Sequence, residues 1–407
     1  MTASVSLDQI RSAKARAAGI VEVTPLDFST TFSALCRRQI YLKLENLQKT
    51  GSFKVRGALN KIQQLAADKR SRGVVTASAG NHAQGLAYAG QMAGVAVTVV
   101  MPTLAALSKV MATEGYHAEV ILAGRDYSEA YERAVSLARE RDATFVHGFD
   151  DAEIIAGQGT LGLEILEQLP DVDTVVVPVG GGGLLAGVLS ALRGAGSRAR
   201  VVGVQTDGAA ALVDSLRTGA PIARTAVDTI ADGLATRTVG ALPFEIMKSD
   251  PPLAVNVSDA ETAAAVLLLL ERTKTVVEGA GAVGLAACLE DRLPAEARKV
   301  VVILSGGNID MNLLDRIINL GLATEGRLFR FSTRIGDQPG ALQRLITVVA
   351  AENANIRQIE HHRARPGLPL TQTDVFLEIE TRGHAHIERL RHALMAKGFE
   401  IHATDQS

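Results

Sequence analysis

From Thr24 to about Asn319, the sequence alternates short runs of β-branched residues with longer runs rich in alanine and leucine. Examples are GVVTAS followed by NHAQGLAYAGQMAG, and VDTVVVPVG followed by GLLAGVLSALRGAG. A strand that is apolar throughout has both faces covered, and strands that alternate with helices form parallel sheets. We therefore predict an α/β body with helices on both faces of its sheets.

The pattern changes near Leu328. The tail reads as strand LFRFSTRI, turn GDQPG, helix ALQRLITVVAAEN, strand NIRQIEHHR, loop ARPGLPLTQ, strand TDVFLEIET, helix HAHIERLRHALMAKG and strand FEIHA. This βαββαβ order is typical of a ferredoxin-like unit. The glycines and charges of GLATEGR indicate a linker. We expect a body over residues 1–322, a linker over 323–327 and a separate domain over 328–407.

Composition excludes several classes of function. A net charge of -2 provides no field to attract nucleic acid or an anionic membrane. The longest apolar run, AAAVLLLL, is far shorter than the roughly 20 residues that cross a bilayer. Cys36 and Cys288 have neither disulfide-framework nor metal-site spacing, and no apolar signal segment opens the chain. We expect a cytoplasmic enzyme-like protein that binds no metal, nucleic acid or membrane.

The stretch TGSFKVRG places Lys54 and Arg56 at the start of an expected helix, with Ser52 able to cap it. A cation is disfavoured there because the N-terminal end of the helix dipole is positive. Taken alone, Lys54 is an ordinary solvated lysine. If it is desolvated, the same position favours a neutral amine, which forms a Schiff base or abstracts a proton. We interpret Arg56 as structural.

A run of four glycines, Gly180 to Gly183, lies between an apolar strand and an expected helix. Consecutive glycines let backbone amides surround an anion, and the helix N-terminus adds its dipole, so we predict a phosphate site. The run also satisfies G-x-G-x-x-A, with Asp207 after the next strand, which keeps a nicotinamide dehydrogenase open as an alternative.

Two further stretches follow expected strands. TASAGNHAQGLA offers small polar groups at a helix start, suited to a carboxylate or a ring edge, although Ser78 or Asn81 could simply cap that helix. VVVILSGGN places Ser305 at the carboxyl end of a strand, where α/β sheets bind ligands.

Together these stretches resemble the threonine/serine dehydratases (threonine ammonia-lyases), which are fold type II pyridoxal-phosphate enzymes. TPL, KLENLQKTGSFKVRGA, SAGNHAQG, VGGGGL, ADG, VEGAGAVGLAA and SGGN occur in the family's order and spacing. The tail resembles an ACT domain, a regulatory amino-acid-binding module, through DQPGAL and NANIRQI. The resemblance implies a tryptophan synthase β-like body of two three-layer α/β/α subdomains, the smaller inserted at about residues 50–150.

The resemblance also implies roles for individual residues. The implied cofactor residues are Lys54 as the Schiff-base lysine, Phe53 against the ring, Asn81 on the ring hydroxyl, Gly180, Gly181, Gly182, Gly183 and the Leu184 amide on the phosphate, and Ser305 at the pyridine nitrogen. The substrate carboxylate would be held by Ser78, Ala79, Gly80, Asn81 and His82. A serine hydroxyl cannot keep the pyridine nitrogen protonated, so a short-lived carbanion and rapid loss of a β-leaving group are expected.

Two departures from relatives refine this expectation. Serine racemase has a serine acting as a base where this chain has Ala79, so we expect elimination rather than racemisation. Related enzymes with a divalent cation have a glutamate where this chain has Gln205, which makes that site doubtful. The expected reaction is deamination of L-threonine to 2-oxobutanoate and ammonia, with L-serine to pyruvate as a second activity.

The tail resemblance implies an amino-acid or nucleotide effector bound between two copies of the tail, in a homo-oligomer such as a dimer or tetramer. The effector residues would be Asp337, Pro339, Gly340 and Asn355. A tail that only oligomerises, or a purely sensory protein, remains an alternative. The tail histidines, including His361, His362, His384 and His386, are expected to be solvated, because no cluster of metal ligands supports them.

Overall fold

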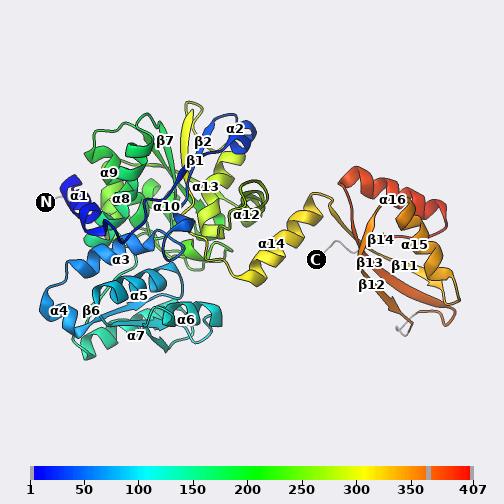
Figure 1. Cartoon of the computed structure of the whole chain (residues 1–407), viewed down its shortest axis with the longest axis horizontal. Helices are drawn as coiled ribbons and strands as arrows, with labels where there is room; N and C mark the ends of the chain where they lie inside the picture. Colours follow the sequence, from blue (N-terminus) through cyan, green and yellow to red (C-terminus); the bar gives the residue numbers. More distant parts are fainter. Residues whose placement is uncertain (1–3, 364–367, 404–407) are drawn as a thin grey trace. The chain divides into compact units, whose positions relative to one another are not determined.

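The structure is a computed structural model that describes residues 4–363 and 368–403. It divides into two compact units, residues 1–310 and 311–407, which are described separately (Figure 1). Helix α14 (Met311–Thr324) opens the second unit, so the expected linker overlaps its last two residues.

The larger sheet of the first unit has six strands in the order β1-β2-β10-β7-β8-β9. Only the β1 pairing is antiparallel, and the remaining neighbours pair in parallel, as predicted. The strands are β1 (Leu26–Phe28), β2 (Gln39–Lys43), β7 (Thr174–Pro178), β8 (Arg200–Thr206), β9 (Leu253–Val257) and β10 (Lys299–Ile303).

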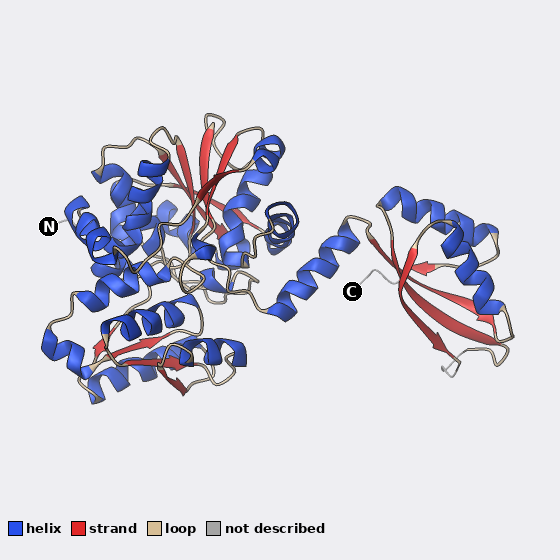
Figure 2. Ribbon diagram, viewed as in Figure 1, coloured by secondary structure: helices blue, strands red, loops and turns tan. Residues whose placement is uncertain are grey.

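Between β2 and β7 the chain leaves this sheet and builds a second, four-stranded parallel sheet in the order β5-β4-β3-β6. Its strands are β3 (Val74–Ala77), β4 (Val97–Met101), β5 (Glu119–Leu122) and β6 (Thr144–Phe145). Figure 2 shows the two sheets as separate layers of strands.

Helices cover both faces of each sheet, which explains the apolar strands. In β3, Val74 packs with α3 and α5, whereas the next residue, Val75, packs with α7. In β7, Val175 and Val177 join the core formed with α8 and α9, whereas Val176 approaches Gly284 of α13. The predicted three-layer arrangement is confirmed for both subdomains.

The helices of the first unit are α1 (Leu7–Ala17), α2 (Thr30–Cys36), α3 (Lys54–Gln63), α4 (Ala67–Arg72), α5 (Asn81–Ala93), α6 (Leu107–Glu114), α7 (Tyr127–Glu140), α8 (Ala152–Gln168), α9 (Gly183–Gly194), α10 (Ala211–Thr218), α11 (Ala241–Ser249), α12 (Asp259–Thr273) and α13 (Gly279–Leu289). Three short 3₁₀ turns are η1 (Glu45–Leu47), η2 (Asp207–Ala209) and η3 (Asp232–Leu234).

The second unit confirms the predicted βαββαβ order. After α14 come β11 (Leu328–Gly336), α15 (Ala341–Ala351), β12 (Asn355–His362), β13 (Gln372–Glu380), α16 (His384–Ala396) and β14 (His402–Ala403). The strands form an antiparallel sheet in the order β12-β13-β11-β14, and α15 and α16 contribute to one core with it.

One expectation for the tail is wrong. His386 is buried: its Nε2 lies 2.9 Å from the carbonyl oxygen of Glu352, and its Nδ1 accepts the Arg382 N–H at 3.1 Å. Its polar atoms are used by the backbone, so it need not face water. His361, His362 and His384 are exposed, as predicted.

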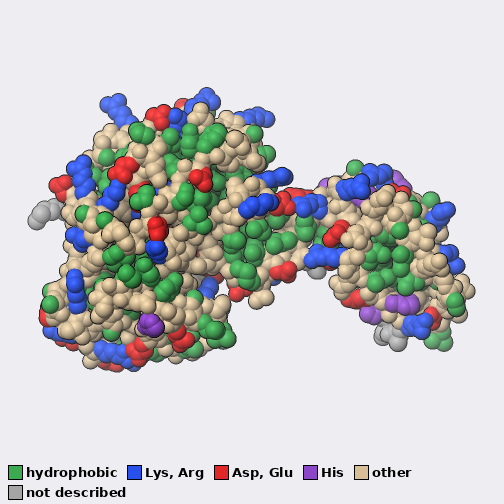
Figure 3. Space-filling model, viewed as in Figure 1, with side chains coloured by type: hydrophobic (Ala, Val, Ile, Leu, Met, Phe, Trp, Pro, Cys, Tyr) green, Lys and Arg blue, Asp and Glu red, His purple; other side chains and the backbone are tan. Residues whose placement is uncertain are grey.

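On the face of the first unit drawn in Figure 3, acidic and basic side chains are interspersed rather than segregated. Among residues 4–363 and 368–403, no helix is both long enough and apolar enough to span a bilayer.

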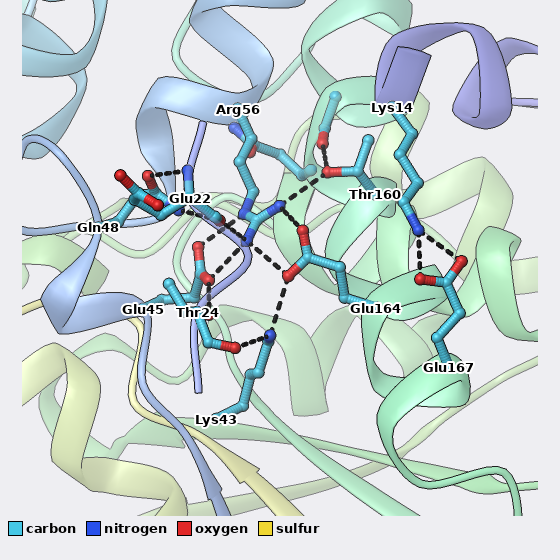
Figure 4. Close-up of polar contacts among 12 residues, drawn as sticks. Lys14, Glu22, Thr24, Lys43, Glu45, Gln48, Arg56, Thr160, Glu164 and Glu167 are labelled. Carbon is cyan, nitrogen blue, oxygen red and sulfur yellow. Dashed lines mark hydrogen bonds and ion pairs between the residues drawn. The ribbon is translucent and has the colours of Figure 1, made fainter. Parts of the chain in front are cut away.

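A buried group of ion pairs connects the start of α3 to its surroundings (Figure 4). Arg56 is buried and donates to both Glu45 oxygens at 2.7 Å and to the two Glu164 oxygens at 2.6 and 2.9 Å. Lys43 donates to Glu164 at 2.9 Å and to the carbonyl oxygen of Thr24 at 2.7 Å. Two cations therefore balance two carboxylates, and the interpretation of Arg56 as structural is confirmed.

The electrostatics of this group explain why it can be buried. Burial opposes ionisation of Glu45, but the charge and hydrogen bonds of Arg56 outweigh it and hold the pKa of Glu45 below its ordinary value. Thr24, in the TPL motif, adds a hydrogen bond from its hydroxyl to Glu45 at 2.5 Å. The group joins β2, η1, α3 and α8.

Replacing Arg56 with methionine leaves Glu45 and Glu164 buried with only Lys43 to balance them. We expect Arg56→Met to lower the free energy of unfolding by about 3 to 5 kcal/mol, the cost of breaking a buried ion pair. Denaturant unfolding monitored by circular dichroism measures this loss. Arg125→Met, which removes an exposed pair with Glu129 on the surface, is the matched control and should leave the transition in place. Equal transitions for the two variants would contradict the structural role of Arg56.

Candidate active site

Lys54 is the first residue of α3 and is half-buried. Its Nζ donates to the carbonyl oxygen of Gly148 at 2.9 Å and lies 5.2 Å from the centre of the Phe53 ring. Burial lowers the pKa of this amine to about 8, although the charge of Glu278 acts in the opposite direction. The amine is therefore far easier to deprotonate than an exposed lysine, as the predicted chemistry needs.

The expected cap of α3 is wrong. Phe53, not Ser52, stands at the N-cap position, and no side chain caps the helix. The Ser52 hydroxyl is buried without a hydrogen-bond partner among the described residues, while its backbone pairs with Gly306. The segment before Lys54 is held by this pairing with the SGGN stretch, which the local sequence pattern does not reveal.

The four-glycine run follows β7, and α9 begins at its last residue, Gly183. Gly182 has φ of +91°, a conformation that favours glycine. A Cβ at Gly181 would lie 2.3 Å from the Phe149 ring, and one at Gly183 would lie 2.9 Å from the Phe149 carbonyl oxygen. Glycine is thus required here for close approach, and the first amides of α9, including that of Leu184, lack acceptors within the helix.

Asn81 begins α5, where Gly80 is the N-cap and no side chain caps the helix. The alternative that Ser78 or Asn81 merely caps α5 is therefore wrong. The amide nitrogen of Asn81 donates to Glu278 at 2.6 Å, and its oxygen accepts from Asn308 at 2.6 Å. Asn81 thus joins the stretch after β3 to those around α13 and β10.

Ser305, directly after β10 and Leu304, is buried, and its hydroxyl lies 3.4 Å from the carbonyl oxygen of Ala280. At 3.4 Å this contact is weak, which leaves the hydroxyl able to meet a ring nitrogen. Sequence reasoning assigned no role to Glu278 or Asn308, although both lie inside the quoted motifs VEGAGAVGLAA and SGGN.

The residues expected to hold the substrate carboxylate lie between the end of β3 and the first turn of α5. Ser78 accepts the Gly80 N–H at 3.2 Å, and a Cβ at Gly80 would meet nothing within 4 Å. His82 is buried, and burial, aided by the charge of Lys54, lowers its pKa to about 3. Its Nδ1 has no partner among the described residues. His82 is therefore a neutral ring with one unused polar atom.

Contacts bring the four predicted stretches together. A Cβ at Gly180 would lie 3.1 Å from the Gly233 oxygen, and one at Gly233 would lie 3.9 Å from the Asn81 amide nitrogen. Lys54 contacts Gly148, which follows β6. The site therefore forms where the carboxyl ends of strands from both sheets converge, as ligand sites in α/β folds do.

These residues fit pyridoxal phosphate. The amides after β7 suit a phosphate, and beside Gly180 the buried Thr236 hydroxyl has no partner within the described ranges. Lys54 could supply the amine, Asn81 an amide N–H for a ring oxygen, and Ser305 a neutral hydroxyl. By contrast, Asp207, the ribose partner that a dehydrogenase would need, is exposed at the start of η2.

At the position where related enzymes are expected to have a glutamate that binds a cation, this chain has Gln205. Gln205 is buried, donates to the Val179 carbonyl oxygen at 3.1 Å and accepts the Leu212 N–H at 2.6 Å. Its side chain therefore supports the backbone around β8. Residues 4–363 and 368–403 contain no group of three His, Cys, Asp or Glu side chains that could hold a metal.

Comparison with known proteins identifies the family. The family model described as pyridoxal-phosphate dependent enzyme matches residues 18–306. An L-threonine ammonia-lyase of Thermotoga maritima is 46% identical over 397 residues, which cover 98% of this chain and 99% of that protein. A catabolic L-threonine dehydratase of Escherichia coli is 42% identical over 315 residues, 77% of this chain and 96% of that protein.

A solved structure agrees with these relatives. Maize serine racemase superposes with a TM-score of 0.74 and 34% identity, covering 80% of this chain and 99% of that chain. The nicotinamide alternative is therefore set aside, and pyridoxal phosphate is confirmed as the cofactor. This chain belongs to the pyridoxal-phosphate-dependent enzymes and has their fold type II architecture.

Proposed function

We propose that this enzyme deaminates L-threonine by β-elimination, yielding 2-oxobutanoate and ammonia, and that it converts L-serine to pyruvate as a second activity. The observation that carries the proposal is the half-buried Lys54 amine, whose pKa burial lowers to about 8, in a site where the residue expected at the pyridine nitrogen is the buried Ser305 rather than a carboxylate. The names of the relatives from Thermotoga and Escherichia support the same substrate.

The cofactor would be held by residues from several elements. Lys54 would attach it, Phe53 would pack on its ring, Asn81 would donate to its ring oxygen, and Ser305 would face its pyridine nitrogen. The amides of Gly180, Gly181, Gly182, Gly183 and Leu184 would bind its phosphate. Bound there, pyridoxal phosphate supplies an electron sink for the substrate Cα.

Side chains and backbone groups of the protein remove the Cα proton and bind the substrate. Once the substrate amino group has taken its place, the freed neutral amine of Lys54 would take the Cα proton. The Cβ–O bond would then break, and the hydroxide would leave as water with that proton. The released enamine hydrolyses to the 2-oxo acid and ammonia. The Ser78 hydroxyl and the backbone N–H groups at the start of α5, from Gly80 through Asn81 to His82, hold the substrate carboxylate. Ala79 offers no base on the opposite face, which favours elimination over racemisation.

Discrimination between the two substrates is modest. Threonine and serine differ by one methyl group, for which a pocket gains about 1 to 3 kcal/mol. Both should therefore react, with threonine preferred.

Lys54→Ala should abolish 2-oxobutanoate formation from L-threonine and the visible absorption of the attached cofactor, because no other amine occupies that position. The assay follows keto-acid release with purified protein, and Lys49→Ala, an exposed lysine paired with Glu22, is the control that should retain both. A variant at Lys54 that kept the absorption band, or D-serine formed from L-serine as fast as ammonia, would overturn the proposal.

The lowered pKa of Lys54 predicts a pH dependence in cofactor-free protein. Only the neutral amine is acylated, and burial disfavours the ammonium, so labelling of Lys54 should rise with pH and reach half its maximal rate near pH 8. Peptide mass spectrometry after timed acylation measures this rate, with the exposed Lys397 as reference in the same digest. A midpoint for Lys54 equal to that of Lys397 would contradict its desolvation.

We further propose that the second unit is an ACT domain that regulates the enzyme. Its ferredoxin-like topology supports this, as does the Escherichia relative, whose nearly full length aligns with only 77% of this chain. The strand register places the proposed effector residues at two opposite ends of the sheet. Gly336 pairs with Gln372, whereas Asn355 pairs with Glu380 at the other end of the same strand, roughly 26 Å away.

Asp337, Pro339 and Gly340 therefore lie at the opposite end of the sheet from Asn355 within one chain. The exposed edge strand β12 suggests how they could share a ligand. If two copies pair antiparallel along β12, Asn355 of one copy approaches the turn over 337–340 of the other. A homo-oligomer, dimer or tetramer, is thus part of the proposal.

Deleting the residues after Leu322 should leave threonine deamination intact and remove its response to amino acids and nucleotides. Asn355→Ala should weaken that response in the full chain, with Gln358→Ala, an exposed residue on the same strand, as control. Initial rates over an effector panel measure both. Unchanged regulation in the truncated enzyme would contradict a regulatory tail.

A further inference from the structure

Glu278 is a buried carboxyl group that the mechanism above does not use. It stands at the N-cap of α13, makes no capping hydrogen bond, and is 8% exposed. A Cβ at Gly306 would lie 2.2 Å from its Oε1, so the glycine of SGGN leaves the space that this carboxyl group occupies. Glu278 is therefore built into the site rather than placed at its rim.

Glu278 and Asn308 hold the side chain of Asn81 from both ends. The Asn81 nitrogen donates to Glu278 at 2.6 Å, and the Asn81 oxygen accepts from Asn308 at 2.6 Å. Asn308 also donates to the carbonyl oxygen of Thr50 at 2.9 Å, which orients its own amide. Rotating the Asn81 amide by half a turn would set oxygen against carboxylate and nitrogen against nitrogen.

Among the residues that the structure describes, this arrangement leaves one N–H donor of the Asn81 side chain without a partner. A carboxamide nitrogen has two N–H groups, and one of them goes to Glu278. The remaining N–H is the group that can meet a ring oxygen of the cofactor. The strength of the hydrogen bond from Asn81 to Glu278 depends on whether Glu278 is ionised, because a carboxylate is a stronger acceptor than a protonated carboxyl group.

The surroundings of Glu278 allow both the protonated and the ionised carboxyl group near neutral pH. Burial raises its pKa to about 7, opposed by the Asn81 hydrogen bond. The charged groups that face it are Lys109 of α6, Asp232 of η3 and Lys54 of α3. Lys109 and Asp232 pair with each other at 2.8 Å, which offsets much of their effect.

We propose that Glu278 is a positioning residue: together with Asn308 it fixes the Asn81 carboxamide so that its second N–H binds the cofactor ring oxygen, and its ionisation sets the strength of that contact. This rests on the cofactor site proposed above. Within the described residues, Glu278 makes no hydrogen bond or ion pair with Lys54. It acts through Asn81, and its effect should therefore be visible in the light absorption of the bound cofactor.

The test is a pH titration of the visible absorption band in the cofactor-loaded full-length enzyme. The unmodified enzyme should show a spectral step with a midpoint near pH 7. Glu278→Gln keeps the size of the side chain but cannot ionise, and this step should disappear. Glu278→Asp shortens the reach to Asn81 and should shift the midpoint. Glu290→Gln, an exposed glutamate at the other end of α13, is the matched control and should titrate like the unmodified enzyme.

Two further measurements separate a failure of the cofactor site from a failure of the proposed role of Glu278. Borohydride trapping of the cofactor on Lys54 in Glu278→Gln confirms that the cofactor site itself is intact, so a failure of the site and a failure of this inference are told apart. A Glu278→Gln enzyme that retains the step of the unmodified enzyme would overturn the proposal. So would the loss of cooperative thermal unfolding in both Glu278 variants, because Glu278 would then serve the fold rather than Asn81.

Discussion

A carboxylate is stable in a protein interior only when cations and hydrogen-bond donors surround it, and Glu45 and Glu164 meet this condition by sharing Arg56. Arg56 lies two residues after Lys54 on α3, so the contacts that neutralise the carboxylates also fix the start of that helix. Lys43 anchors the same group to β2. The position of the Lys54 amine therefore depends on a buried group of charges elsewhere in the core.

Around that amine, burial sets the ionisation of three groups in different ways. Lys54 loses its proton more readily, His82 remains neutral, and Glu278 keeps its proton to a higher pH than usual. The same physical cause, the cost of a charge away from water, acts on all three. Its result is a candidate active site in which Lys54 and Glu278 change charge near neutral pH while His82 stays neutral.

Much of the fold was predictable because its signals are local. Strands buried on both faces must be apolar throughout, and strand β7 and helix α9 begin within two residues of where that pattern places them. The convergence of the four motif stretches was predictable too, because ligand sites gather where the carboxyl ends of parallel strands meet. The cap at Ser52 and the exposure of His386 were mispredicted, because in each case a partner distant in sequence outweighed the local tendency.

The sequence by itself determined the layered α/β body, the βαββαβ tail, the turn of four glycines before α9 and the position of Lys54 at the start of a helix. Each of these depends on a short run of residues. Only the tertiary structure decided which partners Arg56 and Glu278 have. Arg56 pairs with Glu164, 108 residues away, and Glu278 bonds Asn81, 197 residues away. An isolated charged residue in a sequence is most simply taken as solvated. Burial beside a specific partner reverses that expectation, and burial is a property of the folded chain.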